Sequence, residues 1–299
     1  MSEAESITPP TPRDMRQPRP LEGFGVVFAW ELKRNFGRAR FLVAVLLAAI
    51  LCGFLGYQSV PRGAFVSDDT RYFELWKLLD EKSIPFLLPL AALIFVAQGF
   101  SREISQRTLV YHLVRPIGRT TVFLAKFFAG VLPGVVVSTV GLFAMAFATG
   151  VELPQSVMIA IPLVSAAGVT SLGALYYMLS ALFKHGMVAG LLYTFAIEIG
   201  LASARGAAVK ASMSYHMRSL VRGLTNDDFI ERSERVRDEL APPPPPRNVD
   251  EMVTNVLSSA AEVTYETPAT ALMVMAGVTV VTLTIGAWRT ARRDFPLKD

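Results

Sequence analysis

Residues 41–61 have the sequence FLVAVLLAAILCGFLGYQSVP, which carries no charged side chain between Arg40 and Arg62. A helix needs about 20 apolar residues to cross the hydrocarbon core of a bilayer. Backbone amides find no water there, so such a stretch must pair its own hydrogen bonds as a helix. Five similar stretches follow, at 83–101, 127–151, 153–183, 185–204 and 267–288. The sequence therefore predicts an all-α membrane protein with six transmembrane helices.

The overall composition agrees with a membrane protein. Hydrophobic residues make up 52% of the chain and charged residues 18%, against about 25% charged residues in soluble domains. Helices of a soluble core alternate apolar and polar faces, and these six stretches do not. The single cysteine, Cys52, excludes an intramolecular disulfide. The net charge of +4 is small, and we expect no nucleic-acid partner.

The domain boundaries follow from the same pattern. Residues 1–20 hold five prolines and three arginines without an apolar core, which predicts a disordered cytoplasmic tail and not a signal peptide. Residues 21–299 then form one six-span domain. Its largest loop, 205–266, precedes the last span, contains five consecutive prolines, and includes a helix-like segment at 209–224. In the outside segment before the second span, the stretch 71–79 is expected to form a short helix on the outer membrane surface.

The distribution of charge predicts the orientation in the membrane. With the termini inside, the inside segments hold 17 basic and 8 acidic residues, a balance of +9. The outside segments hold 12 basic and 16 acidic residues, a balance of −4. Cytoplasmic loops carry an excess of lysine and arginine. We therefore expect a multi-pass protein of the cytoplasmic (inner) membrane with both termini in the cytoplasm.

An amphipathic segment precedes the first span. In residues 21–36, apolar side chains recur at helical spacing while Lys33 and Arg34 lie off that stripe. A basic amphipathic helix typically lies in the headgroup plane, whereas the alternative is a cytoplasmic extension of the first span. Gly37 and the clustered charges favour a bend, so we expect an interfacial helix.

The segment between the second and third spans is short and basic. A helix is expected over about 102–114, and Pro116 ends it because the residue before a proline avoids helical angles. Gly118 allows a turn, and the third transmembrane helix is expected to begin near Thr120 or Thr121. The prediction is a short cytoplasmic helix, closed by a basic turn that holds Arg115 and Arg119, between two membrane helices.

Enzyme signatures are absent from the sequence. It contains no GxxxxGK[ST] phosphate loop, no HExxH zinc motif and no GxSxG nucleophile elbow. Met213, His216 and Met217 could form a soft-metal site on one helical turn. Methionines on such a helix more often contact lipid or core. We therefore expect no catalytic residue, no metal and no cofactor bound by this chain.

Glu198 is the only ionisable residue well inside a predicted span. A charge at that depth is costly and suggests a function by default, so Glu198 is a candidate for the translocation path. The alternative is a structural or interfacial carboxyl group. Both interpretations stay open from the sequence.

Two GxxxG pairs, Gly130–Gly134 and Gly186–Gly190, lie within predicted spans. Such pairs allow helices to approach closely, either within one subunit or between two. Packing within one subunit is the expected use.

The layout resembles the permease subunits of type-2 ABC exporters over about residues 21–299. The resemblance rests on the segment WELKRNFGRARFL at 30–42 and on the pattern E-x4-TL-x3-L-x-RP-x2-R-x6-K at 103–126. In that family, the loop between spans two and three carries a coupling helix that docks on the ATPase. The resemblance implies that ATPase coupling involves Glu103, Arg107, Thr108, Leu109, Arg115, Pro116 and Arg119.

The resemblance also implies partners. A separate ABC ATPase subunit would bind ATP and Mg²⁺, and this chain would supply the path through the lipid bilayer. One copy of six transmembrane helices could not easily enclose a transport path. A second permease subunit, identical or a paralogue, is therefore expected. The alternatives are an ion- or proton-coupled secondary transporter and a membrane scaffold without transport. The substrate is not predicted.

Overall fold

The computed structural model describes residues 20–37, 39–60, 68–98, 118–183, 185–200, 206–225 and 265–292, and every regular element among them is helical. The predicted all-α class is confirmed for these residues. The predicted tail at 1–20 lies outside them except for Pro20, which begins the first helix. The segment 99–117 and the loop residues 226–264 also lie outside them.

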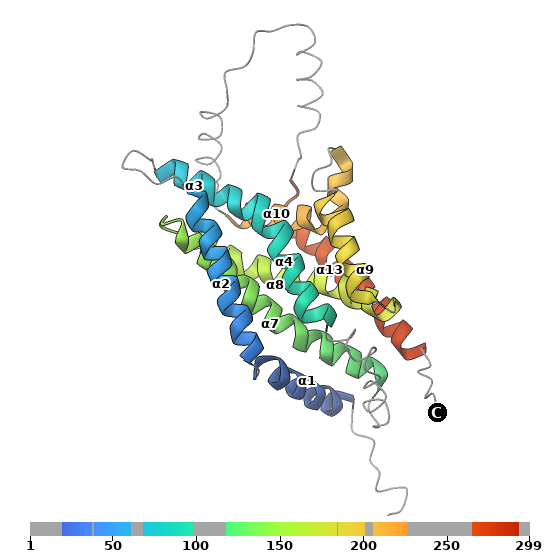
Figure 1. Ribbon diagram of the computed structural model, residues 1–299. Coiled ribbons are helices and arrows are strands. Elements are labelled where there is room, and N and C mark those ends of the chain that lie inside the picture. Colours follow the sequence, from blue (N-terminus) through green and yellow to red (C-terminus); the bar gives the residue numbers. More distant parts are fainter. Residues whose placement is uncertain are drawn as a thin grey trace, which may run out of the picture.

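Four of the predicted spans form helices long and apolar enough to cross a membrane. In the bundle of Figure 1, the second of these helices contacts the first and the third, and the third contacts the fourth. The third span begins at the residue before the predicted start, although the uncharged stretch begins only at 127. The four helices are α2 (Ala39–Ser59), α7 (Arg119–Ala148), α8 (Gln155–Leu182) and α13 (Pro268–Arg292).

The other two predicted spans are helical, and each contains a π turn. The stretch 83–101 forms α4 (Ile84–Ala92) followed by the π-helical turn η2 (Leu93–Ala97). The stretch 185–204 forms α9 (Gly186–Tyr193) followed by the π-helical turn η3 (Thr194–Ile199). Neither is among the candidate spans found by length and composition in the described residues. The structure therefore has four candidate spans, and the six-span topology stays a prediction.

The helix expected before the second span is present. Residues 68–77 form α3 (Asp68–Lys77), which continues through the π-helical turn η1 (Leu78–Ser83) into α4. Leu75, Trp76 and Leu78 are buried in the central core, so the apolar face of this helix packs against the bundle. Its position on the outer membrane surface stays a prediction.

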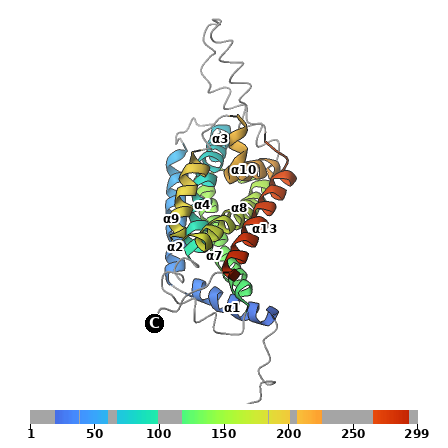
Figure 2. The same cartoon turned by 90° about the vertical axis from the view of Figure 1, so that its right-hand side faces the viewer.

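The amphipathic segment forms α1 (Pro20–Phe36), which lies across one end of the bundle in both ribbon views (Figures 1 and 2). Val27 of α1 is buried against Val122 and Ala125 of α7. The backbone bends at Gly37, where a Cβ atom would lie 2.6 Å from the Lys33 carbonyl oxygen. The predicted helix and bend are confirmed, while the headgroup position of α1 stays a prediction.

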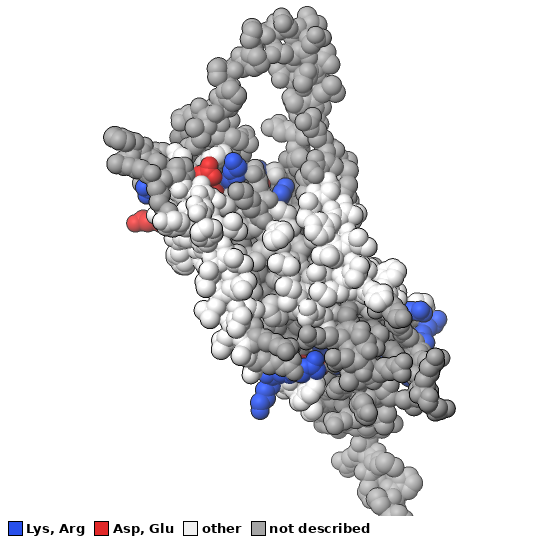
Figure 3. All heavy atoms as spheres, in the orientation of Figure 1, with Lys and Arg blue, Asp and Glu red and all other residues white. Residues whose placement is uncertain are grey.

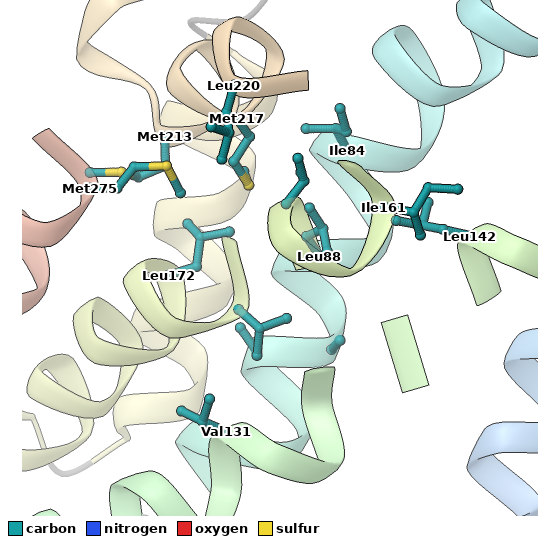
Figure 4. Close-up of a cluster of buried hydrophobic side chains, with 14 of the residues drawn as sticks. Ile84, Leu88, Val131, Leu142, Ile161, Leu172, Met213, Met217, Leu220 and Met275 are labelled. Atoms are coloured by element: carbon teal, nitrogen blue, oxygen red, sulfur yellow. The ribbon is translucent and has the colours of Figure 1, made fainter. Parts of the chain in front are cut away.

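Helix α7 is the centre of the packing. It contacts α1, α2, α4, η2, α8 and α13, and α8 in turn contacts α9, α10 (Met213–Leu224) and α13. Helix α10 lies at the end opposite to α1 (Figure 1) and follows the short 3-10 helix η5 (Gly206–Ala211). Figure 4 shows its apolar side chains meeting those of α4, α8 and α13 in one buried cluster.

Charged side chains of the described residues separate to the two ends of the molecule. On the face in Figure 3, an uncharged belt lies between a mixed acidic and basic end and a basic end. The belt is where α2, α9 and α13 expose large apolar side chains. This arrangement is typical of a protein surrounded by lipid at its waist.

Both GxxxG pairs pack helices within the chain, as expected. A Cβ atom on Gly130 would lie 2.9 Å from the Phe95 carbonyl oxygen, so α7 meets the backbone of η2 there. Gly190 lies against Leu93 and Tyr176 in the same way. These glycines are therefore occupied inside one subunit and leave any contact between subunits to other surfaces.

We predict that Gly130→Ala destabilises the folded protein by about 1–3 kcal/mol, the usual cost of overpacking a tight contact. The neighbour is backbone, which cannot move aside as a side chain can. Gly277→Ala in α13 is the matched control, because a Cβ atom added there would meet no other atom within 4 Å. Unfolding in mixed detergent micelles measures both, and equal stability of the two variants would contradict the packing described for α7.

Candidate functional site

The buried carboxyl group of Glu198 lies in the π-helical turn η3, and its side chain has no solvent-exposed surface. At the end of this turn, the amide of Gly200 donates to the Phe195 carbonyl oxygen at 3.0 Å, which is the wider spacing of a π turn. π turns inside helices frequently occur at functional sites. The sequence identified Glu198 as the one acid inside a span, and its surroundings are now defined.

Four hydrogen bonds converge on this carboxyl group. Oε1 accepts from the Tyr193 hydroxyl at 3.0 Å and from the Met213 amide at 3.1 Å. Oε2 accepts from the amide and the hydroxyl of Ser214, at 2.8 and 2.6 Å. All four groups are donors, which is the arrangement that a carboxylate satisfies with its two oxygens.

The two amides belong to the first turn of α10. The first N–H groups of a helix have no partner within the helix and carry its positive dipole end. Ser212 caps the next amide, that of Tyr215, at 3.2 Å. Glu198 therefore ties the end of the α9–η3 segment to the N-terminus of α10, and this explains structurally why a carboxyl group is buried here.

A second hydrogen-bonded group lies between α8 and η3, beside the donors of Glu198. The Tyr176 hydroxyl lies 2.7 Å from the Thr194 hydroxyl, and Thr194 donates to the Gly190 carbonyl oxygen at 2.9 Å. The Tyr176 and Tyr193 rings meet edge to face with centroids 6.0 Å apart. Polar groups from α8, η3 and α10 are thus joined inside an otherwise apolar bundle.

Two arginines of α10, Arg218 and Arg222, fix the helix to other elements. Arg218 donates to the Asp80 carbonyl oxygen at 3.0 Å, with the Asp80 carboxylate 3.9 Å away. The Arg222 guanidinium lies 3.8 Å from the centroid of the Tyr265 ring and 5.5 Å from that of Trp76. Burial, and to a lesser extent the nearby Asp80 charge, raises the pKa of Tyr265. The phenol therefore stays neutral as a partner for the cation.

Met213, His216 and Met217 do not converge on a common site. The two methionines are buried in the apolar core, and Met217 fills the space beside Gly168. His216 Nε2 lies 3.1 Å from the Lys210 carbonyl oxygen, and Nδ1 lies 3.6 Å from a Glu266 carboxylate oxygen. Within the described residues, no cluster of three or more histidine, cysteine or acidic side chains could hold a metal ion.

A buried ion pair joins α1 to α7 at the other end of the molecule. Lys126 Nζ lies 3.1 Å from Glu31 Oε1, and the exposed fractions of the two side chains are only 4% and 7%. Arg34 lies 3.4 Å from the same Glu31 oxygen, and Asn35 donates to the Ala129 carbonyl oxygen at 3.1 Å. Because Lys126 is neutralised within the protein, its charge does not end the third span.

Of the predicted coupling residues, Arg119 lies within the described part of the chain. Arg119 is the first residue of α7, and its Nη1 donates to the Ala291 carbonyl oxygen near the end of α13 at 3.4 Å. A cation beside the last carbonyls of a helix is favourable. The other predicted coupling residues lie outside the described residues; they are Glu103, Arg107, Thr108, Leu109, Arg115 and Pro116.

Sequence reasoning missed Glu31, although a signal was present. Glu31 follows Val27 by one helical turn, so it shares the buried face of α1 and not the basic one. An acid on a buried face requires a cation, and Lys126 was available in the same pattern that carries the family resemblance. Ser212 is the corresponding signal for α10, because serine is a preferred helix cap.

The four apolar helices and the uncharged belt define a multi-pass membrane protein. A family profile described as ABC-2 family transporter protein matches residues 27–295, which is nearly the whole chain. The chain belongs to this family, whose members are the membrane-embedded permease components of ABC transporters and associate with an ABC ATPase. No curated protein sequence matches the chain.

We predict that Glu198→Ala destabilises the protein by about 1–3 kcal/mol or more, because each buried donor left unpaired incurs a desolvation penalty of that size. Glu198→Gln keeps two acceptor lone pairs and costs less. Thr284→Ala in α13 is a control for a mutation in an exposed part of the bundle, since its hydroxyl donates to a carbonyl of its own helix. The rate of proteolysis in the 205–266 loop and unfolding in detergent measure the effect. Wild-type stability and proteolysis of the Glu198→Ala variant would contradict the role of Glu198 in holding α10.

We predict that Lys126→Met costs about 3–5 kcal/mol, because it leaves the Glu31 carboxylate buried without its main partner. The double variant Glu31→Gln/Lys126→Met should recover most of this loss, since the two most buried charges are then both removed and Arg34 is more exposed than either. A double-mutant cycle by thermal unfolding measures the coupling. Additive effects of the two changes would mean that the two charges do not interact.

Proposed function

We propose that the chain is the permease subunit of an ATP-driven exporter, and that a separate ATPase subunit binds ATP and Mg²⁺ and drives transport through it. The family match over residues 27–295 carries this proposal. The sequence lacks a phosphate-binding loop of its own. The chain would therefore contribute the path, and its partner the hydrolysis.

The position of α7 supports a mechanical role for the segment before it. Gly130 and Gly134 pair with Phe95 and Ala91 in antiparallel order. The N-terminal turns of α7, from Arg119 on, therefore extend past the end of η2. Residues 99–117 connect η2 to this projecting tip. A coupling helix at about 102–114 would thus act directly on the end of a long helix.

The tip of α7 is fixed on three sides. Besides the Glu31–Lys126 ion pair, the Tyr177 hydroxyl of α8 donates to the Phe123 carbonyl oxygen at 3.1 Å, and Gly286 of α13 lies against the Phe123 ring. A displacement of the connecting segment would therefore move α1 and α7 together and would reach α8 and α13 through Phe123. Such joint movement would transmit a conformational change in a separate ATPase to the transmembrane helices.

The described charges support the predicted orientation. The basic residues at the α1 end outnumber the two acids of α1, Glu22 and Glu31; they include Lys33, Arg34, Arg119, Lys126, Arg289 and Arg292. The positive-inside rule then favours the cytoplasm for this end. The ATPase would bind on the same side, and α10 would face outward.

The exposed apolar faces support a partner subunit as well as lipid. Helix α2 exposes Leu42, Leu46, Ile50 and Phe54 along one side, and α9 and α13 expose comparable residues. A second permease would use one of these faces, because the GxxxG pairs are already occupied. The secondary-transporter alternative is less supported, since Glu198 is the only acid within the described apolar segments and is held by four donors.

We predict that Glu103→Ala/Arg107→Ala lowers permease-stimulated ATPase activity by at least about tenfold without loss of the folded permease. Both residues lie in the expected docking helix. The control is Arg71→Ala/Glu74→Ala, which removes one base and one acid from α3 at the opposite end and should leave ATPase activity unchanged. The assay is ATP hydrolysis by the reconstituted complex; wild-type stimulation in the first variant would exclude this segment as the coupling site.

We predict that the active complex contains two permeases and two ATPases. The reason is the small number of spans in one chain relative to a path that must be enclosed. Native mass spectrometry of the complex in detergent gives the stoichiometry. A single permease that still transports after reconstitution would contradict the expectation.

A further inference from the structure

Two tryptophans near the basic end each have an arginine stacked on the ring. Trp30 in α1 and Trp288 in α13 are exposed by 50% and 53%. Each is followed four residues later by an arginine that stacks on its ring. The Arg34 guanidinium carbon lies 5.3 Å from the Trp30 ring centroid, and that of Arg292 lies 4.6 Å from the Trp288 centroid.

Each pair continues an exposed apolar stripe. In α13, Val281, Ile285, Trp288 and Arg292 recur at helical spacing, and the first three are exposed. In α1, Val26 precedes Trp30 by one turn and is also exposed. Tryptophan rings typically sit at the level of lipid headgroups. The two arginines thus lie where the apolar waist ends and headgroups begin.

Basic residues predominate around both pairs. The α7 tip joins the two helices, because α1 packs on it and Arg119 reaches the end of α13. The exposed charged side chains that the structure describes in this region are basic, and the acid Glu31 is buried and paired. Helix α1 also contains Glu22, two turns before Trp30. The basic residues outnumber the acids here, so the net effect on a phosphate group is attraction.

We propose that the two Trp–Arg pairs, Trp30–Arg34 and Trp288–Arg292, bind anionic phospholipids at the end of the molecule where α1, α7 and α13 meet. The acyl chain lies along the exposed stripe, the tryptophan ring contacts the glycerol region, and the guanidinium group binds the phosphate. A soluble partner such as an ATPase would contact the charges but not Val281 and Ile285. This binding does not depend on the proposed transport activity.

Tryptophan fluorescence tests the proposal directly, because the chain has only three tryptophans. Trp76 is buried at the opposite end and gives a constant background. The full chain carrying Trp30→Phe, so that Trp288 is the reporter, is reconstituted in vesicles of equal phosphatidylglycerol and phosphatidylcholine content. In one sample the phosphatidylglycerol carries brominated acyl chains, and in the other sample the phosphatidylcholine does.

We expect brominated phosphatidylglycerol to quench Trp288 more strongly than brominated phosphatidylcholine, and we call this difference the excess quenching. The excess should fall about fivefold in Arg292→Gln, because one basic residue near an anionic surface contributes about that factor. Arg292→Lys should keep part of the excess. Lys77→Gln, which removes a charge at the other end, should keep all of it. Millimolar glycerol 3-phosphate should not compete, since the headgroup alone lacks the chain contacts.

Equal quenching by the two brominated lipids would overturn the proposal. So would an excess that survives Arg292→Gln, because it would then reflect the bulk charge of this end. An excess that added ATPase abolishes would assign the surface to the protein partner instead. Circular dichroism of each variant confirms that the helices are retained, and the variant Trp288→Phe, in which Trp30 is the reporter, measures the α1 pair independently.

Discussion

The buried ion pair between Glu31 and Lys126 fixes the position on which the rest of this structure depends. A buried charge without a partner costs several kcal/mol, so α1 and the tip of α7 cannot separate cheaply. Helix α7 is about 45 Å long, and its tip is the part that projects past η2. Without α1, that tip would present a lysine and apolar residues without their partners.

A second buried carboxyl group serves the opposite end. Glu198 joins η3 to α10, and Arg218 and Arg222 of α10 pack against Asp80, Trp76 and Tyr265. Both carboxyl groups thus use a helix that lies outside the main bundle to close one end of it. Helix α7 reaches both regions, since near its other end Met145 contacts Ser83 of η1.

Local hydropathy predicted the parts of the fold that depend on local chemistry. The apolar stretches, the α1 bend at Gly37 and the helix at 213–224 could all be predicted from spacing and composition. The lengths of α4 and α9 could not, because the helical run in each passes into a π turn, which no local pattern indicated. The placement of α3 also depended on the core that Leu75 and Trp76 join, which only the tertiary structure defines.

The candidate site was predictable in identity but not in arrangement. Glu198 stood out because an acid in an apolar stretch is rare, yet its donors come largely from a different segment of the chain. Lys126 was part of the resemblance pattern, but its partner Glu31 lies on another helix. Long-range pairs of this kind leave only indirect signals, such as an acid on a buried face. In the proposed exporter, these pairs would set how motion at one end reaches the other.

The distance between α1 and the α7 tip tests the central claim most directly. Spin labels at Lys33→Cys and Thr120→Cys, in a Cys52→Ser background, report this distance by electron paramagnetic resonance in the permease–ATPase complex. The account predicts the same distance in the nucleotide-free and the nucleotide-trapped complex, while the distance between the Thr120 sites of two permeases changes. A nucleotide-dependent change in the 33–120 distance would contradict the description of α1 and α7 as one moving unit.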